Sequence, residues 1–383
     1  MNPTDEPPAK DPLASVDRAK LLPLVRQALE EQTVEAVAHW QAQAIKPGGS
    51  GSGLYKLTGT AQTGAGTSPW SLVLKILLIN DRKVVSQTEW KREALLYESG
   101  LLDTIPGGLR AVRCYSQESL ADDEIWLWLE DVSEKGDGPW PPERHALAAY
   151  HLGQFNGSQL AQSLPSEAFL SRQFDRKYFL RDGHTIDPLL EALDQPYIKR
   201  VFTDDVLAAI HWLWEAREQI ISHMYDRLPQ CFGHLDTNRA NLFSGQRPDG
   251  TEETIAIDWA RSGIGPIGED LRPMLTVDLA MRSIDIDMAQ AAEYDRTVFA
   301  AYTEGMAASG WQGDPQLARY GFAATAAVFS LLRGAPLVPG LISSYQDGLF
   351  GLPYDEALDH LNTYLRLAAG WADEVRRLGP VLF

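Results

Sequence analysis

Short stretches of alternating hydrophobic and polar positions occupy the first 132 residues, and this alternation is typical of β-strands. Five such stretches predict strands at 34–45, 54–63, 70–79, 108–117 and 124–132. Helical spacing of leucine and valine predicts one helix at 14–31, and a second is predicted at 86–99, closed by Gly100. The four prolines of residues 1–14 predict a loose tail.

A Gly- and Pro-rich segment at 133–142 predicts a linker, and beyond it the pattern becomes mainly helical. Helices are predicted at 143–164, 187–194, 203–227, 285–309, 315–334 and 355–378. One exception is 241–258, which predicts two strands joined by a turn at Pro248-Asp249-Gly250. The pattern predicts an α+β protein of two lobes with a cleft between them. The N-terminal lobe, 15–132, is a small antiparallel sheet with one central helix, and the C-terminal lobe, 143–383, is larger and mainly helical.

Composition narrows the choice of partner. The chain has 34 Lys and Arg against 52 Asp and Glu, a formal net charge of −18. This balance argues against general affinity for nucleic acid or an anionic membrane, and it is compatible with a cationic or neutral small substrate. Two cysteines, Cys114 and Cys231, are too few for a disulfide framework. The N-terminus has no apolar signal region, and the apolar stretch 322–332 is shorter than a membrane span, so we expect a cytoplasmic protein.

The sharpest motif lies in the predicted hairpin. His234, Asp236 and Asn241 follow the pattern His-x-Asp-x4-Asn, and Asp258 comes seventeen residues after Asn241. Composition alone would produce the three-residue pattern on the order of 0.01 times. A hydroxyl that attacks a γ-phosphoryl group needs one carboxylate to orient it, and the accompanying metal needs hard oxygen ligands. The alternative is a capped turn in which Asp236 or Asn238 binds backbone donors.

Two features of the sheet lobe could serve the same chemistry. Lys75 lies in an otherwise apolar strand and could reach phosphates, although a solvated lysine on an edge strand is the alternative. The glycines of loop 48–53 would let backbone N–H groups approach phosphates, whereas a flexible hairpin tip is the competing interpretation. This loop is not a P-loop, because no Gly-Lys-Ser/Thr follows it.

Together these motifs resemble the aminoglycoside phosphotransferase and choline kinase-like family of small-molecule kinases, which have a protein-kinase-like fold. The resemblance covers nearly the whole chain after residue 35, with the specific motifs in 46–132 and 231–272. It implies that Asp236 is the catalytic base and that His234 braces the catalytic loop. It also implies that Asn241 and Asp258 ligate Mg²⁺ ions held by ATP, and that Asp270 has a structural role.

The resemblance extends to the nucleotide side. It implies Glu93 as the partner of Lys75, with Glu89 as the competitor one turn earlier. Residues 126–132 resemble the hinge of the family, which implies adenine contacts from the carbonyl of Glu130 and the amide of Val132. The glycines of the loop that would cover the phosphates are Gly49, Gly51 and Gly53.

The chain departs from the family pattern in the catalytic loop and after Asp258. Leu235 stands where many members have glycine, so we expect a slightly different backbone there. Eleven residues separate Asp258 from Asp270, which is too short for a peptide-docking segment and disfavours a protein substrate. We therefore expect an O-phosphotransferase that uses ATP or GTP with Mg²⁺. Its acceptor would be a hydroxyl of an aminoglycoside, an amino sugar, a choline-like alcohol or a related metabolite. A non-catalytic nucleotide-binding module and, less favoured, a protein kinase are the alternatives, and the oligomeric state stays open.

Overall fold

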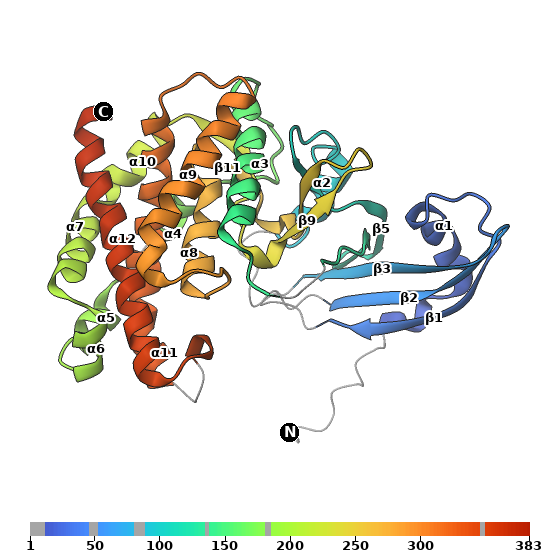
Figure 1. The fold of residues 1–383 in the computed structure, drawn as a ribbon, viewed down its shortest axis with the longest axis horizontal. Helices are drawn as coiled ribbons and strands as arrows, with labels where there is room; N and C mark the ends of the chain where they lie inside the picture. The colour runs from blue at the N-terminus through green and yellow to red at the C-terminus, as the bar shows by residue number, and fades with distance from the viewer. Residues whose placement is uncertain (1–11, 46–52, 80–88, 135–137, 181–184, 345–348) are drawn as a thin grey trace. The chain divides into compact units, whose positions relative to one another are not determined.

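The computed structural model describes all of the chain except residues 1–11, 46–52, 80–88, 135–137, 181–184 and 345–348. The chain divides into two compact units (Figure 1), which are Met1–Ala94 with Val112–Val132, and Leu95–Ala111 with Ser133–Phe383. Residues 95–111 thus cluster with the second unit, whereas the sequence places them in the N-terminal lobe. Most of the predicted tail lies outside the described residues, and Pro12–Ser15 forms a 3₁₀ turn.

The first unit is built on a five-stranded sheet in the order β1-β2-β3-β6-β5, and every pairing is antiparallel. Its strands are β1 (Ala36–Ala44), β2 (Gly53–Thr63), β3 (Gly66–Leu78), β5 (Cys114–Ala121) and β6 (Glu124–Glu130). Alternation along β3 sends Leu72, Leu74 and Ile76 into the core, where they meet Trp126 and Trp128. Helix α1 (Arg18–Ala28) packs its leucines against this core.

The predicted strand 108–117 is wrong as one element. It divides into β4 (Leu109–Ala111) and β5, because the chain leaves one sheet and joins another between them. β4 pairs in parallel with β10 (Glu252–Ala256), which lies more than 140 positions further along the chain. Helix α2 (Arg92–Ser99) precedes β4. Of the predicted helix 86–99, residues 86–88 lie outside the described residues and 89–91 are in a turn.

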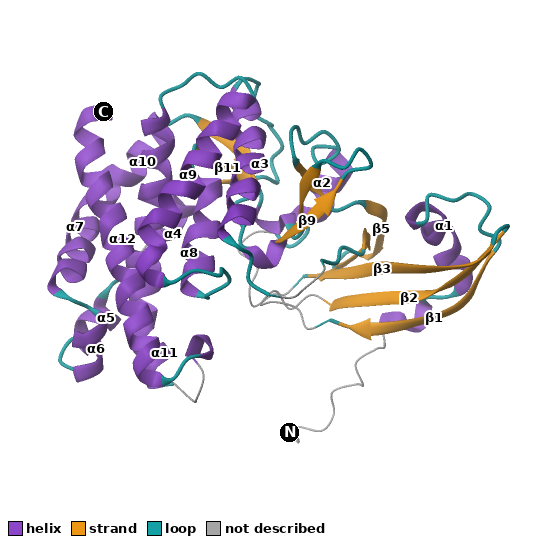
Figure 2. Cartoon of the chain, viewed as in Figure 1, coloured by secondary structure: helices purple, strands orange, loops and turns teal. Residues whose placement is uncertain are grey.

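Helices dominate the second unit (Figure 2). The long ones are α3 (Pro142–Leu160), α7 (Asp204–Ser222), α9 (Ala291–Ala308), α10 (Pro315–Ala327) and α12 (Tyr354–Leu382). The shorter ones are α4 (Phe174–Phe179), α5 (Asp187–Ala192), α6 (Pro196–Val201), α8 (Arg272–Ala280) and α11 (Val338–Ser343). Helix α8 was not predicted, because nearly all of its side chains are buried and no polar face gives it a period. The sheet unit and the helical unit together confirm the predicted α+β class.

Two small sheets hold the segments that carry the motif. The predicted hairpin 241–258 is confirmed: β9 (Leu242–Gln246) pairs antiparallel with β10, and β4 completes this sheet. The other sheet has the order β7-β11-β8, from β7 (Ser171–Arg172), β11 (Gly263–Pro266) and β8 (Gln230–Gly233). The motif therefore lies between β8 of one sheet and β9 of the other.

Helices α3 and α9 lie side by side (Figure 1) and approach closely through glycines. A Cβ atom on Gly153 would lie 2.0 Å from the main-chain oxygen of Tyr302, and one on Gly305 would lie 2.0 Å from that of Tyr150. Only glycine permits this distance, because any side chain would overlap the backbone of the partner helix. The contact fixes α3 within the core of the unit.

One helical run, Pro315–Ser343, has the length and apolar composition of a membrane span among the described residues. It is longer than the apolar stretch 322–332, because α10 continues through the irregular turns at Val328–Leu337 into α11. More than half of its most apolar part is buried inside the unit. Its polar residues Thr325 and Ser330 are buried with hydrogen bonds to Gly321 and Tyr364. These contacts are those of a core helix.

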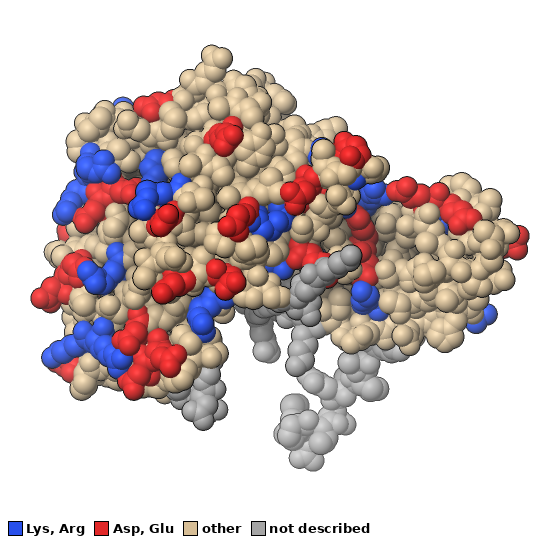
Figure 3. Space-filling model, viewed as in Figure 1, with Lys and Arg blue, Asp and Glu red and all other residues tan. Residues whose placement is uncertain are grey.

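Charged side chains of both signs are interspersed on the face of the helical unit that Figure 3 shows. Among the ion pairs of this unit, Arg200 of α6 binds Asp355 and Asp359 of α12. Exposed pairs of this kind contribute little to stability, about 0–1 kcal/mol each. They do neutralise one another locally, so the net charge of the chain does not gather in one patch on this face.

Candidate active site

The catalytic loop predicted from the motif runs from His234 to Asn241. The side-chain amide of Asn241 donates to the main-chain oxygen of Asp236 at 2.8 Å and to its carboxylate Oδ2 at 3.2 Å. Asn238 caps the 3₁₀ turn Arg239–Asn241 by accepting from the amide of Ala240 at 3.1 Å. Because the Asn241 nitrogen is engaged with Asp236, its carboxamide oxygen is the atom that can ligate a metal.

His234 is fully buried and connects the loop to the segment before Asp258. Its Nδ1 accepts from the amide of Asp236 at 3.2 Å, and its Nε2 donates to the main-chain oxygen of Ile257 at 2.8 Å. The amide of Ile257 in turn donates to the main-chain oxygen of Asn241 at 2.9 Å. These contacts fit the bracing role predicted for His234.

Asp258 lies two positions beyond the end of β10 and is half-buried. Its φ of 59° lies in the left-handed region, which non-glycine residues adopt at a cost of roughly 1–2 kcal/mol. The pairing of Leu242 with Ala256 places Asn241 and Asp258 at the same end of the hairpin. The backbone pairing thus brings residues that are seventeen positions apart in the sequence to neighbouring places at the end of the hairpin.

Asp270 is a buried carboxylate that binds the backbone of the catalytic loop. It accepts from the amides of His234 at 3.1 Å and Leu235 at 2.6 Å, and from the side chain of Asn156 at 3.1 Å. Its main-chain oxygen also accepts from the hydroxyl of Thr237. Burial raises the pKa of Asp270, and its hydrogen bonds to donors oppose that rise. The contacts fit the structural role predicted for this residue.

Leu235, at the position where many relatives have glycine, has a φ of 62°. The left-handed conformation strains a leucine, but the side chain is 8 % exposed and its main-chain amide is held by Asp270. Burying a leucine contributes about 1.5–3 kcal/mol, which is of the same order as the strain. The expected difference from the backbone of relatives with glycine stays a prediction.

Lys75 and Glu93 form the ion pair on the nucleotide side. Lys75 Nζ lies 2.5 Å from Glu93 Oε2, and both side chains are nearly buried. Glu89, the competing partner, instead lies 3.7 Å from Arg92. Lys75 belongs to β3, the central strand of its sheet, so the edge-strand alternative is wrong.

The other predicted nucleotide contacts also belong to the first unit. Gly53 is the first residue of β2 and pairs with Ile76, whereas Gly49 and Gly51 lie outside the described residues. Glu130 is the last residue of β6, where it pairs with Leu72, and Val132 lies two positions beyond. The structure thus places Lys75 and Glu93 together in the first unit. It places His234, Asp236, Asn241 and Asp258 together in the second.

Several residues at the site were not predicted. Arg261 Nε lies 3.8 Å from Asp236 Oδ2, on a side chain that is half exposed. Asn156 binds Asp270, and Asp278 binds the amide of Arg239. Asn156 and Asp278 are buried polar residues of α3 and α8, and buried polar groups need partners.

The donor set indicates how a metal could be held. Within the described ranges, no group of three or more His, Cys, Asp or Glu side chains could bind a metal ion by itself. Asn241 and Asp258 offer hard oxygen atoms, which Mg²⁺ prefers, and Mg²⁺ usually completes its shell with phosphate oxygens and water. The residues therefore fit a metal that arrives with a nucleotide.

The first unit has a sheet with a nearly buried Lys–Glu pair, and the second has Asp236 and Asn241 in the loop before a hairpin and Asp258 after it. These features are typical of a phosphotransferase of the protein-kinase-like class. Comparison with family models confirms this class, because the model of the phosphotransferase enzyme family matches residues 65–312. The chain belongs to that family. The predicted resemblance and the predicted enzyme class, a small-molecule phosphotransferase, are thereby confirmed.

Solved structures share the fold at low sequence identity. A microcompartment-associated aminopropanol kinase is 14 % identical with a TM-score of 0.53, covering 93 % of this chain and 99 % of its own. An amicoumacin kinase in complex with AMP-PNP, Ca²⁺ and Ami is 13 % identical with a TM-score of 0.50, covering 90 % of this chain and 93 % of its own. A search of curated protein sequences finds no significant match.

Proposed function

We propose that this protein is an ATP- and Mg²⁺-dependent O-phosphotransferase that moves the γ-phosphoryl group to a hydroxyl of a small molecule. One observation carries the proposal: Asn241 binds Asp236 through its amide nitrogen and lies beside Asp258 at the end of the hairpin. A base candidate and one oxygen ligand thus occur in one loop, and the second oxygen ligand follows the hairpin strand that returns to it. The amicoumacin kinase of similar fold, solved with AMP-PNP and Ca²⁺, supports the use of a nucleotide with a divalent cation.

Asp236 would orient the acceptor hydroxyl and take its proton as the oxygen attacks the γ-phosphorus. The new O–P bond forms while the bond to the β-phosphate oxygen breaks, and ADP leaves. The carboxylate is 23 % exposed on its side chain, so an acceptor can reach it. Asn241 and Asp258 would hold Mg²⁺, which neutralises charge on the phosphates when it is bound with ATP.

The first unit would hold the nucleotide. Lys75, fixed by Glu93, would bind the α- and β-phosphates, and the glycine loop ending at Gly53 would cover them. The carbonyl of Glu130 and the amide of Val132 would bind adenine, as the position of both at the end of β6 allows. GTP is the alternative donor, and the cytoplasm is the proposed location.

The acceptor we propose is a hydroxylated amine, such as an aminoglycoside, an amino sugar or a choline-like alcohol. The aminopropanol kinase of similar fold supports this class. The net charge of −18 favours a cationic ligand over an anionic one, although exposed charges are screened within about 8 Å. The hydroxyl that is modified is to be found by screening.

The proposal is tested by nucleotide binding followed by turnover. Mg²⁺ with AMP-PNP should raise the melting temperature, and EDTA should remove the part of the shift that depends on metal. ATP consumption is then measured against a panel of aminoglycosides, amino sugars and choline analogues. Binding without turnover on any acceptor would instead indicate a non-catalytic module.

The base is tested by Asp236→Asn. This variant should keep the melting shift with Mg²⁺ and AMP-PNP and lose at least ~100-fold in turnover, because the acceptor proton has no carboxylate to receive it. Asp249→Asn, in the exposed turn of the same hairpin, is the control and should keep normal turnover. Turnover close to wild type in Asp236→Asn would overturn the assignment of the base.

A further inference from the structure

Glu134, in the segment predicted as a linker, is a nearly buried carboxylate with three donors. Its side chain is 10 % exposed. It accepts from the indole Nε1 of Trp140 at 3.0 Å, from Arg239 Nη2 at 2.7 Å and from the amide of Ser244. These donors belong to the segment before α3, to the catalytic loop and to β9. A solvated linker residue would not collect such contacts, so Glu134 has a defined position in the second unit.

Arg239 is the residue of the catalytic loop that Glu134 binds. Its guanidinium also donates to the main-chain oxygen of Leu242 at 2.9 Å and lies 4.4 Å from the ring centre of Trp140. Its main-chain amide donates to both carboxyl oxygens of Asp278, at 2.9 and 3.0 Å. Arg239 is thus held at its backbone from one helix and at its side chain by Glu134.

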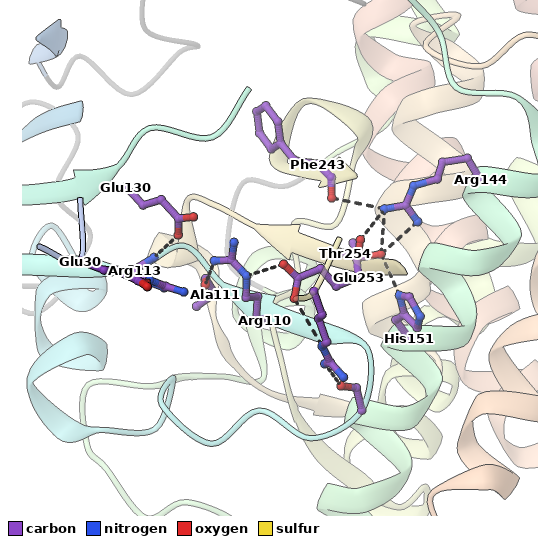
Figure 4. A network of polar contacts seen from close by, with 12 residues as sticks. Glu30, Arg110, Ala111, Arg113, Glu130, Arg144, His151, Phe243, Glu253 and Thr254 are labelled. Carbon is purple, nitrogen blue, oxygen red and sulfur yellow. Dashed lines mark hydrogen bonds and ion pairs between the residues drawn. The ribbon is translucent and has the colours of Figure 1, made fainter. Parts of the chain in front are cut away.

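Trp140 packs against the guanidinium group of Arg239 and also against that of a second arginine. Arg144 lies 4.6 Å from the centre of the same ring, so two guanidinium groups approach one indole. Arg144 also donates to the main-chain oxygens of Phe243 and Glu253 and to the hydroxyl of Thr254 (Figure 4). These bonds tie both strands of the hairpin to α3. The position of Glu134 is therefore fixed relative to the hairpin that carries Asn241.

The position of Arg239 in the loop explains why its restraint matters. It opens the 3₁₀ turn that ends at Asn241, and the side chains of Asn241 and Asn238 both donate to the carboxylate of Asp236. A shift of Arg239 would therefore move both of these donors and disturb the position of that carboxylate. Removing Glu134 would cause such a shift, because a nearly buried guanidinium would lose its counter-charge and seek water.

We propose that Glu134 is a positioning residue, which acts through Arg239 to hold Asp236 and Asn241 in their reactive arrangement. The catalytic consequence rests on the proposed function, whereas the restraint on the loop does not. Glu134 would contact no reacting atom. Its effect would be to keep the catalytic loop ordered.

The restraint is tested without nucleotide, by hydrogen–deuterium exchange of the full chain. Glu134→Ala should raise exchange at least ~10-fold in peptides that cover 234–242 and leave α10 and α12 unchanged. Arg110→Ala is the matched control, because it breaks a partly buried ion pair with Glu253 on the same hairpin, away from the loop. Unchanged exchange in 234–242, or an equal rise throughout the second unit, would overturn the proposal.

The catalytic consequence is tested by a double-mutant cycle in which ATP consumption is measured with water as acceptor. Glu134→Ala and Arg239→Ala should each lower kcat ~10- to 100-fold and change the KM for ATP less than ~2-fold. Because both substitutions remove the same contact, kcat of the double variant should be no more than ~2-fold below kcat of the less active single variant. Multiplicative losses would overturn the proposal.

A conservative variant covers the case in which Glu134→Ala fails to fold. Glu134→Gln keeps an oxygen for the amide of Ser244 and loses the charge that faces Arg239, so it should show a smaller loss in kcat of the same kind. Wild-type protein that consumes no ATP with water or with any acceptor would overturn the proposed function, and the exchange experiment would still decide the restraint.

Discussion

Packing determines which carboxylate pairs with Lys75. Two carboxylates one turn apart could have met the lysine, and the sequence alone left both open. Glu93 faces the sheet and is 1 % exposed, whereas Glu89 lies beside Arg92 with an exposed side chain. The buried carboxylate is the one whose loss leaves a nearly buried cation without a counter-charge.

Glu93→Gln should therefore lower kcat/KM for ATP roughly 10- to 100-fold, since a hydrogen bond to a charged group contributes about 1.5–3 kcal/mol. Glu89→Gln should change it less than ~2-fold and serves as the matched control. Steady-state kinetics of both variants, after circular dichroism has confirmed folding, make the comparison. Equal losses in kcat/KM in the two variants would contradict a specific role of Glu93 in holding Lys75.

At the scale of elements, the contact between α3 and α9 determines where the catalytic loop can lie. Helix α3 carries Asn156, which binds Asp270, and Tyr302 of α9 donates to Asn156 at 2.9 Å. The close approach of the two helices at Gly153 brings Tyr302 within hydrogen-bond distance of Asn156. Helix packing thus supports the loop through a buried polar network, which must stay satisfied to be favourable.

Gly153→Ala should destabilise the protein by about 1–3 kcal/mol, because its Cβ would overlap the main-chain oxygen of Tyr302 and force the helices apart. Gly370→Ala, on an open face of α12, should instead stabilise it by roughly 0.5–1 kcal/mol, because alanine favours the helix. Urea unfolding of both variants measures the free energies. A neutral Gly153→Ala would show that the helices can separate at little cost.

At the scale of the whole molecule, buried histidines make stability depend on pH. His145 is fully buried between Trp140 and Tyr294, and neither ring nitrogen has a hydrogen-bond partner among the described residues. Burial, together with the positive charges of Arg239 and Arg144, lowers the pKa of His145 from 6.5 to about 3. Below pH 6.5 the unfolded chain therefore binds a proton at His145 that the folded chain does not bind. The free energy of unfolding falls for this reason as pH decreases from 6.5 toward 3.

His145→Phe removes that penalty. Relative to wild type, the variant should gain up to about 1.4 kcal/mol per pH unit as pH falls below 6.5. The measurement is the free energy of unfolding in urea between pH 7.5 and 4.5. Leu152→Ala on the same helix is the control, because its stability loss involves no proton and should be the same at each pH. A constant difference between His145→Phe and wild type would mean that His145 takes up its proton in the folded state.

Local sequence pattern predicted much of the fold and the residues of the catalytic loop. The hairpin at 241–258 was predicted because the turn signal Pro248-Asp249-Gly250 joins two segments that predict strands, and both strands are present. The parallel pairing of β4 with β10 was not predicted, since nothing within 108–117 indicates a partner so far along the chain. Helix α8 was missed because a fully buried helix lacks the polar face that gives a sequence its helical period.

The sequence by itself determined which chemistry is present: a carboxylate, an amide and a second carboxylate at a spacing that one turn and one hairpin can bring together. That information is local, because turn residues and strand alternation act over a few positions. The tertiary structure alone decided which carboxylate meets Lys75 and that Glu134, Asp278 and Asn156 support the loop. Those choices depend on burial, because a charged or polar group becomes costly without a partner only after distant segments have excluded water from it.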